Sequence, residues 1–543
     1  MIKNYLSLLK DEFKGYNAKS LMADMMAGLT VCAVALPLAL AFGVSCGADA
    51  AAGLITAIIA GLVISALSGA SFQISGPTGA MTAVLITIIA KDGGELSGVF
   101  FVGLLAGILM LLAGILKLGK LVNLIPKPVI TGFTSGIAVI IALGQIDNFF
   151  AVKSEGSSTV QKLLSYGDLG FSPDLASVGI GLLVIAIMIF WPAKLNAKVP
   201  SSLVGIIVAA VVAAIFFPEV ATVGEIPKTL FLEKRLSFAL LDWSNIESYV
   251  GPAFTIAVLG MIESLLCGAS ASAMTRGRFD ADIELVGQGI GNIIIPFFGG
   301  VPATAAIART SVAIKSGSKT RLTGIFHAVF LLLSMFLLGG VMSKLPMAGL
   351  AGVLMMTAWR MNEWHEIKKI FSRRFKSEIA QYLITLVATV VFDLTVAILI
   401  GILFSLIAFI SRTLEISMDH SMVDTQRMDE ELDMDKIGST CVVYITGAIF
   451  FANTQVISNY LHTIPKADRV ILSVRGVSVM DPDAALAIWE IAENYEEQGV
   501  ELLICGLNPG VRKVLERAGV VEKMGEDKFY WSVDRALIHK QNA

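Results

Sequence analysis

Residues 71–81 read SFQISGPTGAM and interrupt an otherwise apolar part of the chain. Their polar side chains, Gly76 and Pro77 stand directly before a short apolar segment that ends near Ala90. Residues 299–310 read GGVPATAAIART and precede another short apolar segment in the same way. Irregular backbone is tolerated at membrane depth only where it is buried in protein or lines a cavity. Two such interruptions in corresponding halves predict the central site of a transporter. The alternative is a pair of kinked but otherwise ordinary helices.

The apolar stretches around these two segments are long enough to cross a membrane. A helix needs ~20 apolar residues to span the hydrocarbon core. Stretches of about this length follow one another at 24–43, 51–68, 99–116, 129–146, 175–191, 201–217, 250–268, 322–340, 378–392 and 395–411. Of the 543 residues, 55% are hydrophobic and 16% charged, whereas soluble domains carry about 25% charged residues. The composition predicts a polytopic membrane protein and excludes collagen, coiled-coil and disordered classes.

Charge and cysteine content argue against several other functions. The net charge of −3 leaves no basic surplus for phosphate backbones, so we expect no nucleic-acid partner. The five cysteines form no CxxC pair, which argues against a zinc site or a disulfide framework. No nucleophile lies in a recognisable pattern with a base. We therefore expect neither an enzyme nor a bound metal or cofactor.

The distribution of lysine and arginine predicts the orientation in the membrane. Basic residues gather in alternate loops, at 117–127, 194–198, 276–278, 315–321 and 368–376. Such loops face the cytoplasm. The N-terminus and the tail after Arg412 fall on the same side, so we expect both termini to be cytoplasmic in a protein of the cell (inner) membrane. Segments 150–170 and 218–245 would face outward.

The composition changes abruptly after Arg412. An acidic linker at 413–437 is followed by strand-like segments at 441–445, 470–474 and 501–505, which alternate with helical segments at 453–464, 483–498 and 509–518. This order predicts a small α/β domain. The predicted division is an N-terminal segment at 1–20, a membrane domain at 21–412, the linker, and a soluble domain at 438–543.

Four motifs, taken together in order and spacing, resemble the SulP family of anion transporters, which includes sulfate permeases, pendrin and prestin. They are ALPLALAFG at 35–43, SGPTG at 75–79, GQGIGN at 287–292 followed by 297–310, and a C-terminal region similar to the STAS domain. The resemblance implies fourteen transmembrane segments as two inverted repeats of seven, divided into core and gate subdomains. It also implies a homodimer, elevator-like movement of the core, and substrate bound between the third and tenth segments.

The two interrupted segments suggest how an anion would be held. A helix N-terminus carries about half a positive charge and free N–H groups, and so binds anions. Half-helices that begin at Gly79-Ala80 and Ala306-Ile307 and face each other would converge on one spot. Thr78 would add a hydroxyl donor or would cap its own helix, and Phe42 would help to shape the pocket. With the basic residue discussed next, the predicted substrate-binding residues are Phe42, Thr78, Gly79, Ala80, Ala306, Ile307 and Arg309.

Two charges stand within the spans. A charge there costs about 2.5–3.5 kcal/mol on insertion scales. The resemblance places a basic residue of the anion site at Arg309 and the acidic coupling residue at Glu263. In sodium-coupled relatives a hydroxyl residue follows one turn later, whereas this chain has Cys267, and a thiol is a poor ligand for a hard cation. A buried carboxyl group favours its neutral form, so we predict proton coupling through Glu263 and disfavour sodium. The alternative is a static Glu263–Arg309 ion pair.

Other polar residues receive structural interpretations. Glu284, Gln288 and Asn292 recur at i, i+4 and i+8 on one helix face and are predicted to form interhelical hydrogen bonds. Asp24 and Asp393 lie at the starts of spans and are predicted to cap them. In the STAS-like region, the position that is phosphorylated in related domains holds an acidic residue, Asp483. It would provide either a constitutively charged interaction surface or a helix cap.

These observations predict a secondary active transporter of a small anion, with sulfate or a similar inorganic anion favoured, working as a proton symporter. A C4-dicarboxylate or bicarbonate transporter of the same family is an alternative. A nucleobase transporter of the related fourteen-segment fold is disfavoured by Arg309 and by the STAS-like domain. A membrane-tethered STAS signalling scaffold is an alternative of another class. The expected partners are the anion, the coupling proton, the lipid bilayer, a second copy of the chain and a cytoplasmic protein bound by the STAS-like domain.

Overall fold

The computed structural model describes residues 2–91, 95–120, 126–156, 159–192, 195, 199–237, 239, 246–392, 394–423 and 439–542. The acidic side chains predicted for the linker at 424–435, together with Lys194, Lys198 and Asp393, lie outside these residues. The chain forms two compact units, Met1–Ser405 and Leu406–Ala543, and each is considered by itself.

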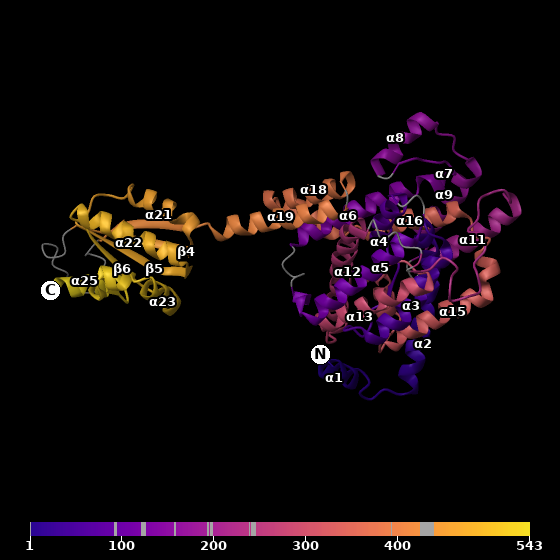
Figure 1. The fold of residues 1–543 in the computed structure, drawn as a ribbon, viewed down its shortest axis with the longest axis horizontal. Coiled ribbons are helices and arrows are strands. Elements are labelled where there is room, and N and C mark those ends of the chain that lie inside the picture. Colours follow the sequence, from indigo (N-terminus) through magenta and orange to yellow (C-terminus); the bar gives the residue numbers. More distant parts are fainter. Residues whose placement is uncertain are drawn as a thin grey trace. The chain divides into compact units, whose positions relative to one another are not determined.

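The first unit is helical (Figure 1). Its first half contains α1 (Ile2–Glu12), α2 (Ala18–Ser45), α3 (Ala50–Leu67), α4 (Gly79–Lys91), α5 (Ser97–Ile115), α6 (Lys127–Gly144), α7 (Ile146–Phe150), α8 (Thr159–Leu169), α9 (Leu175–Phe190) and α11 (Ser201–Phe216). Its second half contains α12 (Ile246–Thr275), α13 (Ala281–Ile294), η3 (Ile295–Phe298), α14 (Ile307–Lys315), α15 (Leu322–Met342), α16 (Met347–Met361), α17 (Trp364–Arg373), α18 (Lys376–Val391) and α19 (Leu394–Thr413), the last of which continues into the second unit.

Six helices in the described part of the chain are long and apolar enough to cross a membrane by themselves. The helix α16 was not among the predicted spans. It has only 15 residues, is built largely from Ala, Gly and Met, and carries Trp359 and Arg360 in its last turn. Its first turns are nevertheless buried against other helices.

Glycine allows α2 and α3 to pack closely. A Cβ atom on Gly53 would lie 2.0 Å from the carbonyl oxygen of Ala39, and one on Gly43 would lie 2.4 Å from that of Asp49. Small residues at such crossings let the backbones of membrane helices approach each other. This contact fixes the helix that carries Phe42.

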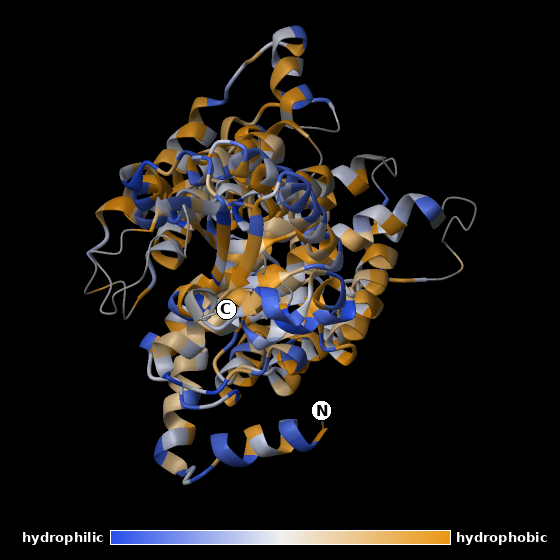
Figure 2. Ribbon diagram, turned by 90° about the vertical axis from the view of Figure 1, so that its left-hand side faces the viewer, coloured by the Kyte–Doolittle hydropathy of each residue, from blue (hydrophilic) through white to orange (hydrophobic). Residues whose placement is uncertain are grey.

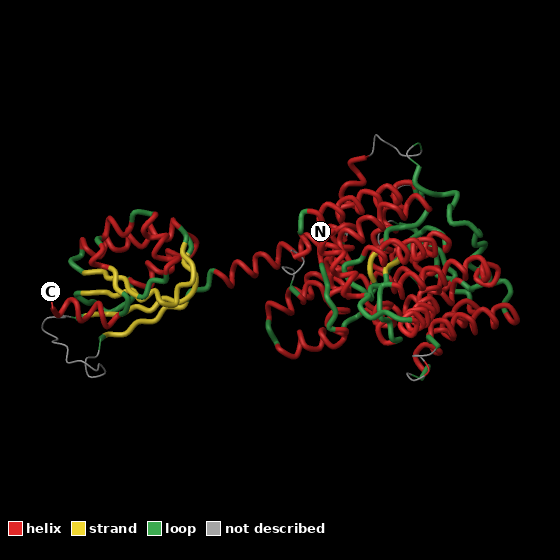
Figure 3. Tube along the Cα trace, turned by 90° about the horizontal axis from the view of Figure 1, so that it is seen from below, coloured by secondary structure: helices red, strands yellow, loops and turns green. Residues whose placement is uncertain are grey.

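The two interrupted segments meet as a pair of short strands. β1 (Ser75–Gly76) pairs antiparallel with β2 (Thr304–Ala305), with Ser75 opposite Ala305 and Gly76 opposite Thr304. Both strands are buried among helices, and Figure 3 shows them in yellow within the red bundle. The prediction of two Gly/Pro-interrupted half-spans is confirmed, and the alternative of two kinked but ordinary helices is wrong. That the interruptions pair as strands was not predicted. Each strand leads directly into a short helix, β1 into α4 and β2 into α14.

The N-terminal segment is joined to the same bundle by buried charges. The Glu12 carboxylate accepts hydrogen bonds from Nε and Nη2 of Arg321 at 2.9 and 2.7 Å, and both side chains are 4% exposed. Arg321 also donates to the carbonyl oxygens of Ala66 and Ser68 at the end of α3, where the helix dipole favours a cation. Hydrophilic and hydrophobic residues alternate along α1, beside the label N in Figure 2.

Asp24 does not cap its own helix, so this prediction is wrong. The helix α2 begins at Ala18, and Asn17 is its N-cap. The buried Asp24 carboxylate instead accepts hydrogen bonds from the backbone N–H groups of Lys319 and Thr320, just before α15. An acid nearly two turns inside α2 thus satisfies two backbone amides of the distant loop that precedes α15.

The second unit is a five-stranded sheet covered by helices. The strand order is β3 (Ser417–Met422), β4 (Thr440–Ile449), β5 (Arg469–Met480), β6 (Glu501–Cys505) and β7 (Phe529–Tyr530). β3 and β4 are antiparallel, and the remaining pairs are parallel. The helices are α21 (Thr454–Leu461), α22 (Pro482–Glu497), α23 (Pro509–Arg517), α24 (Val520–Met524) and α25 (Val533–Asn542), with short 3-10 turns η5 (Phe451–Asn453) and η6 (Glu526–Lys528). β3 lies within the stretch that was predicted to be linker.

Alternate residues of the central strands face two separate cores. Val443 and Leu472 pack with residues of α22 and α23, whereas Val442 and Ile471 pack with Ala536 of α25. This follows from the two-residue period of a strand. The predicted α/β domain is confirmed, with two edge strands that the sequence pattern did not reveal.

The cap of α22 is not the residue proposed for it. Asp481 is the N-cap and accepts a hydrogen bond from the Ala484 N–H at 2.7 Å. Asp483 lies in the first turn with an exposed side chain.

Candidate functional site

The site is built around the β1–β2 pair. Because each strand has only two residues, side chains of neighbouring helices satisfy the backbone beside it. The Ile74 N–H donates to Oγ1 of Thr310 at 3.0 Å, and the Ala306 N–H donates to the Ile74 carbonyl oxygen at 3.0 Å. The Thr304 and Ser264 hydroxyls lie 2.8 Å apart, which links β2 to α12. The polar backbone of both interruptions is thus paired within the protein, as burial in a membrane requires.

The start of α4 faces an acidic residue of α12. The Thr78 hydroxyl donates to Oε2 of Glu263 at 3.1 Å, and the Thr78 carbonyl oxygen accepts from the N–H of Thr82 at 3.0 Å. Glu263 is partly exposed and Thr78 is buried. Among the described hydrogen bonds, the Thr78 hydroxyl engages α12 and not the amides of its own helix. Its cap and anion-donor roles both remain hypotheses.

Gly79 is the point where three helices meet. A Cβ atom added there would lie 2.1 Å from Cδ1 of Ile141 in α6 and 3.3 Å from Cε1 of Phe42 in α2. Phe42 is 5% exposed, and Ala80 is fully buried. The structure therefore brings Phe42, Thr78, Gly79 and Ala80 together around the first turn of α4.

On the opposite side, Ala306 is the N-cap of α14, and the Ile307 side chain that follows is 42% exposed. Ala306 hydrogen-bonds to Ile74, so its place beside the strand pair is fixed. Ile307 points away from the packed interior.

Arg309 reaches from α14 to the segment before α4. Its Nη2 donates to the Pro77 carbonyl oxygen at 2.7 Å, and the side chain is 2% exposed. In the part of the chain that the structure describes, Nη1 has no hydrogen-bond partner. It lies where a side chain of residue 76 would be, 2.5 Å from a Cβ atom added to Gly76. The guanidinium group thus fits only because residue 76 is glycine.

The two charges of the site do not pair directly. Arg309 bonds to Pro77 and Glu263 bonds to Thr78, which are consecutive residues. Within the described residues no direct ion pair joins Arg309 to Glu263, and the alternative of a static pair stays a prediction. Both charges instead flank the N-terminus of α4.

Cys267, one turn after Glu263, is engaged in the framework. Its thiol donates to Oγ1 of Thr310 at 3.2 Å, and Thr310 in turn accepts from Ile74. Among the described residues, no group of three His, Cys, Asp or Glu side chains could hold a metal ion.

Sequence reasoning missed how the strands are supported. The Pro77 carbonyl is a backbone group that no side-chain pattern reveals. Asn292 and Gln288 were predicted as interhelical contacts, but they bond to Ala303 and to Ser75 beside the two strands. The spacing of these residues gave their helix face, and only the fold gives their targets.

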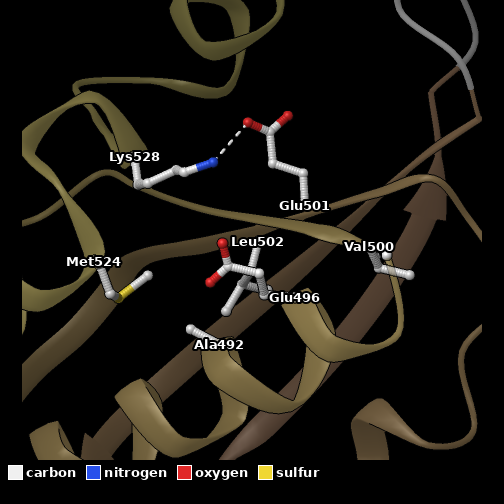
Figure 4. A pocket seen from close by; sticks show the side chains of 8 residues that line it. Ala492, Glu496, Val500, Glu501, Leu502, Met524 and Lys528 are labelled. Atoms are coloured by element: carbon white, nitrogen blue, oxygen red, sulfur yellow. Dashed lines mark hydrogen bonds and ion pairs between the residues drawn. The ribbon is translucent and has the colours of Figure 1, made fainter.

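The second unit has a pocket of about 330 Å³, shown in Figure 4. The Lys528 ammonium and Nε of Arg469 each bond to Glu501, at 2.9 and 2.8 Å. Glu496 also lines it. Because the cations are already engaged, this pocket does not offer a ready anion site.

Comparisons with known proteins agree with this architecture. The model of the sulfate permease family matches residues 21–389, and that of the STAS domain matches residues 431–536. The protein YvdB of Bacillus subtilis is 35% identical over 535 residues, which cover 95% of this chain and 97% of YvdB. The bicarbonate transporter BicA of Picosynechococcus is 28% identical over 540 residues, covering 96% and 94% of the two chains.

A solved structure has the same fold over the whole chain. The murine Slc26a9 anion transporter, in its inward-facing state, superposes with a TM-score of 0.87 at 17% identity and covers 100% of this chain and 95% of its own. The likeness shows a shared fold, and the helices here are consistent with fourteen segments in two inverted repeats followed by a STAS domain. The chain therefore belongs to the sulfate permease family of anion transporters.

Proposed function

We propose that this protein is a proton-coupled symporter that carries a small inorganic anion, sulfate in the first instance, across the cell membrane. The observation that carries the proposal is the hydrogen bond from Thr78 to Glu263 at the N-terminus of α4. It joins an acidic group to the place where helix geometry favours an anion.

The anion would bind between the starts of α4 and α14. Gly79 and Ala80 on one side and Ile307 on the other lie in the first turns of two helices, whose N–H groups have no partners within their own helix. The Ala306 N–H is already bonded to Ile74, so Ala306 would contribute to the shape of the site. Buried Arg309 adds a full positive charge. Phe42 and the small residues would limit the size of the bound anion.

The charge of Glu263 would couple anion binding to proton binding. When Glu263 is ionised, its negative charge opposes an anion at the adjacent helix start. When Glu263 binds a proton, this repulsion disappears and the anion binds more tightly. Each ligand then raises the affinity for the other by the same factor, which favours loading of the carrier with both. The Thr78 hydroxyl contacts Glu263 and would sense both events.

The choice of anion rests on the family and not on single residues. Sulfate is favoured because the matching family is that of sulfate permeases. Bicarbonate is the second candidate, since a bicarbonate transporter is among the relatives, and C4-dicarboxylates are a third. We further propose that two copies form a homodimer and that the core helices move like an elevator, as the resemblance implies.

Uptake into proteoliposomes tests the proposal. Labelled sulfate, bicarbonate, fumarate and chloride would be offered under separate proton and sodium gradients. We expect sulfate uptake that follows the proton gradient, and we expect Glu263→Gln to remove this dependence while anion exchange at equal pH persists. The matched control is Glu247→Gln, an exposed acid near the start of the same helix. Uptake that follows sodium and ignores pH would contradict proton coupling.

Truncation separates transport from the scaffold alternative. Residues 1–412 alone should still transport the anion, because every proposed contact lies within them. A truncated chain that folds but carries none of the four anions would favour a signalling scaffold.

A further inference from the structure

Asn292 of α13 pairs with the backbone of Ala303 through two hydrogen bonds. Its Nδ2 donates to the Ala303 carbonyl oxygen at 2.9 Å, and its Oδ1 accepts from the Ala303 N–H at 2.8 Å. Ala303 directly precedes Thr304, the first residue of β2. The side-chain amide of Asn292 therefore acts as the partner that a third strand would provide.

Gln288, one turn earlier on the same helix, holds the other strand. Its Nε2 donates to Oγ of Ser75 in β1 at 2.9 Å and to Oε1 of Glu284 at 2.9 Å. Glu284 is fixed in turn by the Ser68 hydroxyl and by the Gly69 N–H at 3.0 Å. Glu284, Gln288 and Asn292 are all 0% exposed. Side chains on one face of α13 thus hydrogen-bond to β1 and to the residue directly before β2.

The strand pair needs such support. Two-stranded ribbons are only marginally stable alone, and this one has two residues on each strand. A slip by one residue would turn every side chain to the opposite face. It would also displace the starts of α4 and α14, which follow the strands directly.

We propose that Gln288 and Asn292 are positioning residues for anion transport, which keep β1 and β2 in register and thereby fix the separation between the N-termini of α4 and α14. The inference rests on the anion-binding role proposed above for those helix starts. Neither residue needs to touch the anion. Their effect reaches it through the backbone that they hold.

The test compares Asn292→Leu and Asn292→Asp with wild type. Leucine has a similar volume and makes neither bond. A neutral aspartic acid can donate and accept as the amide does, whereas an ionised one can only accept. Thr389→Val is the control, because it removes a buried hydroxyl whose hydrogen bond among the described residues stays within α18, to the Thr385 carbonyl.

Two measurements are made on each full-length protein. Hydrogen exchange of the peptide that covers residues 299–308 reports the strand, and the KM and kcat of sulfate uptake report the site. We expect faster exchange in Asn292→Leu and a KM raised by about tenfold, which requires only part of the free energy of the two lost hydrogen bonds, with a smaller change in kcat. At pH 5.5 the exchange rate and the KM of Asn292→Asp should be closer to those of wild type at the same pH than they are at pH 8. Thr389→Val should change neither measurement.

The outcomes separate this inference from the proposed function. Faster exchange in Asn292→Leu with unchanged KM would overturn the positioning role and leave the transport proposal standing. The same holds if KM rises equally in Thr389→Val. If Asn292→Leu does not fold, Asn292→Asp provides both measurements. Wild-type protein that carries none of the tested anions would overturn the proposed function, and the inference with it.

Discussion

Replacing Gly76 with alanine should move the guanidinium group of Arg309 without removing its charge. The added Cβ atom would lie 2.5 Å from Nη1 and 3.3 Å from Cζ of Arg309, and 3.5 Å from Cα of Ala57. Non-bonded heavy atoms prefer separations of about 3.5 Å or more. Because the backbone at Ala57 is already at that distance, the flexible arginine must retreat by about 1 Å.

This retreat would break the contact with Pro77. The bond from Nη2 to the Pro77 carbonyl oxygen is 2.7 Å long, and a further 1 Å or so would exceed hydrogen-bonding distance. A hydrogen bond to a charged group contributes about 1.5–3 kcal/mol. If about half of this loss appears in anion binding, the KM for sulfate rises roughly three- to twelvefold, since about 1.4 kcal/mol is a factor of ten.

A double-mutant cycle in proteoliposomes measures the effect. KM for sulfate would be determined for wild type, Gly76→Ala, Arg309→Ala and the double variant. Once the arginine is truncated, the added methyl group meets only ordinary contacts, so Gly76→Ala should have no further effect in that background. Gly179→Ala is the control, because a Cβ atom there has no neighbour within 4 Å. An equal rise in KM with and without Arg309 would refute the reasoning.

Three further predictions concern stability and reactivity. Glu12→Gln should lower the unfolding temperature of the detergent-solubilised protein markedly, since breaking a buried ion pair costs about 3–5 kcal/mol. Asp11→Asn, whose ion pair is exposed, should have little effect. Equal shifts of the unfolding temperature in the two variants would contradict this prediction. Asp481→Ala should destabilise the STAS domain by about 1 kcal/mol through loss of the α22 cap, whereas Asp483→Ala should destabilise it much less. Urea unfolding of the full chain measures both effects. A larger loss of stability in Asp483→Ala would show that the cap is misassigned. Burial raises the pKa of the Cys505 thiol from 9.0 to about 11, so maleimide should label it at pH 8 only after unfolding. The unfolded thiol ionises first, so the domain should lose stability as the pH rises from about 9 to about 11; rapid labelling of native protein would argue against burial.

The half-helices could be predicted from sequence because their signals are local. Pro77 and Pro302 lack the N–H group that a helix interior needs, and each stands beside glycine or small residues in an apolar region. The pairing of Ser75 with Ala305 could not be predicted in the same way. It joins residues far apart in sequence, and two-residue strands leave no alternating pattern.

The charged residues of the site could also be predicted from the sequence, whereas their hydrogen-bond partners could not. Arg309 and Glu263 stood out because charges within membrane spans are costly. Their partners did not, because Arg309 bonds to a backbone carbonyl and Thr78 could have bonded to its own helix. Asp24 shows the same limit. Its position suggested a cap, and the amides that it binds instead lie about 300 residues later in the chain, in the loop before α15.

The contact between Glu12 and Arg321 makes the N-terminal segment a practical handle on the helix bundle. Because Glu12 is held against the end of α3 and the start of α15, a fluorophore or spin label near residue 2 would be carried by those helices as one body. Distances measured from such a label to a second label on α9 would report any displacement of α3 and α15 relative to α9 during turnover. An affinity tag fused at this end should be separated from α1 by a flexible spacer, so that it does not disturb the buried ion pair between Glu12 and Arg321.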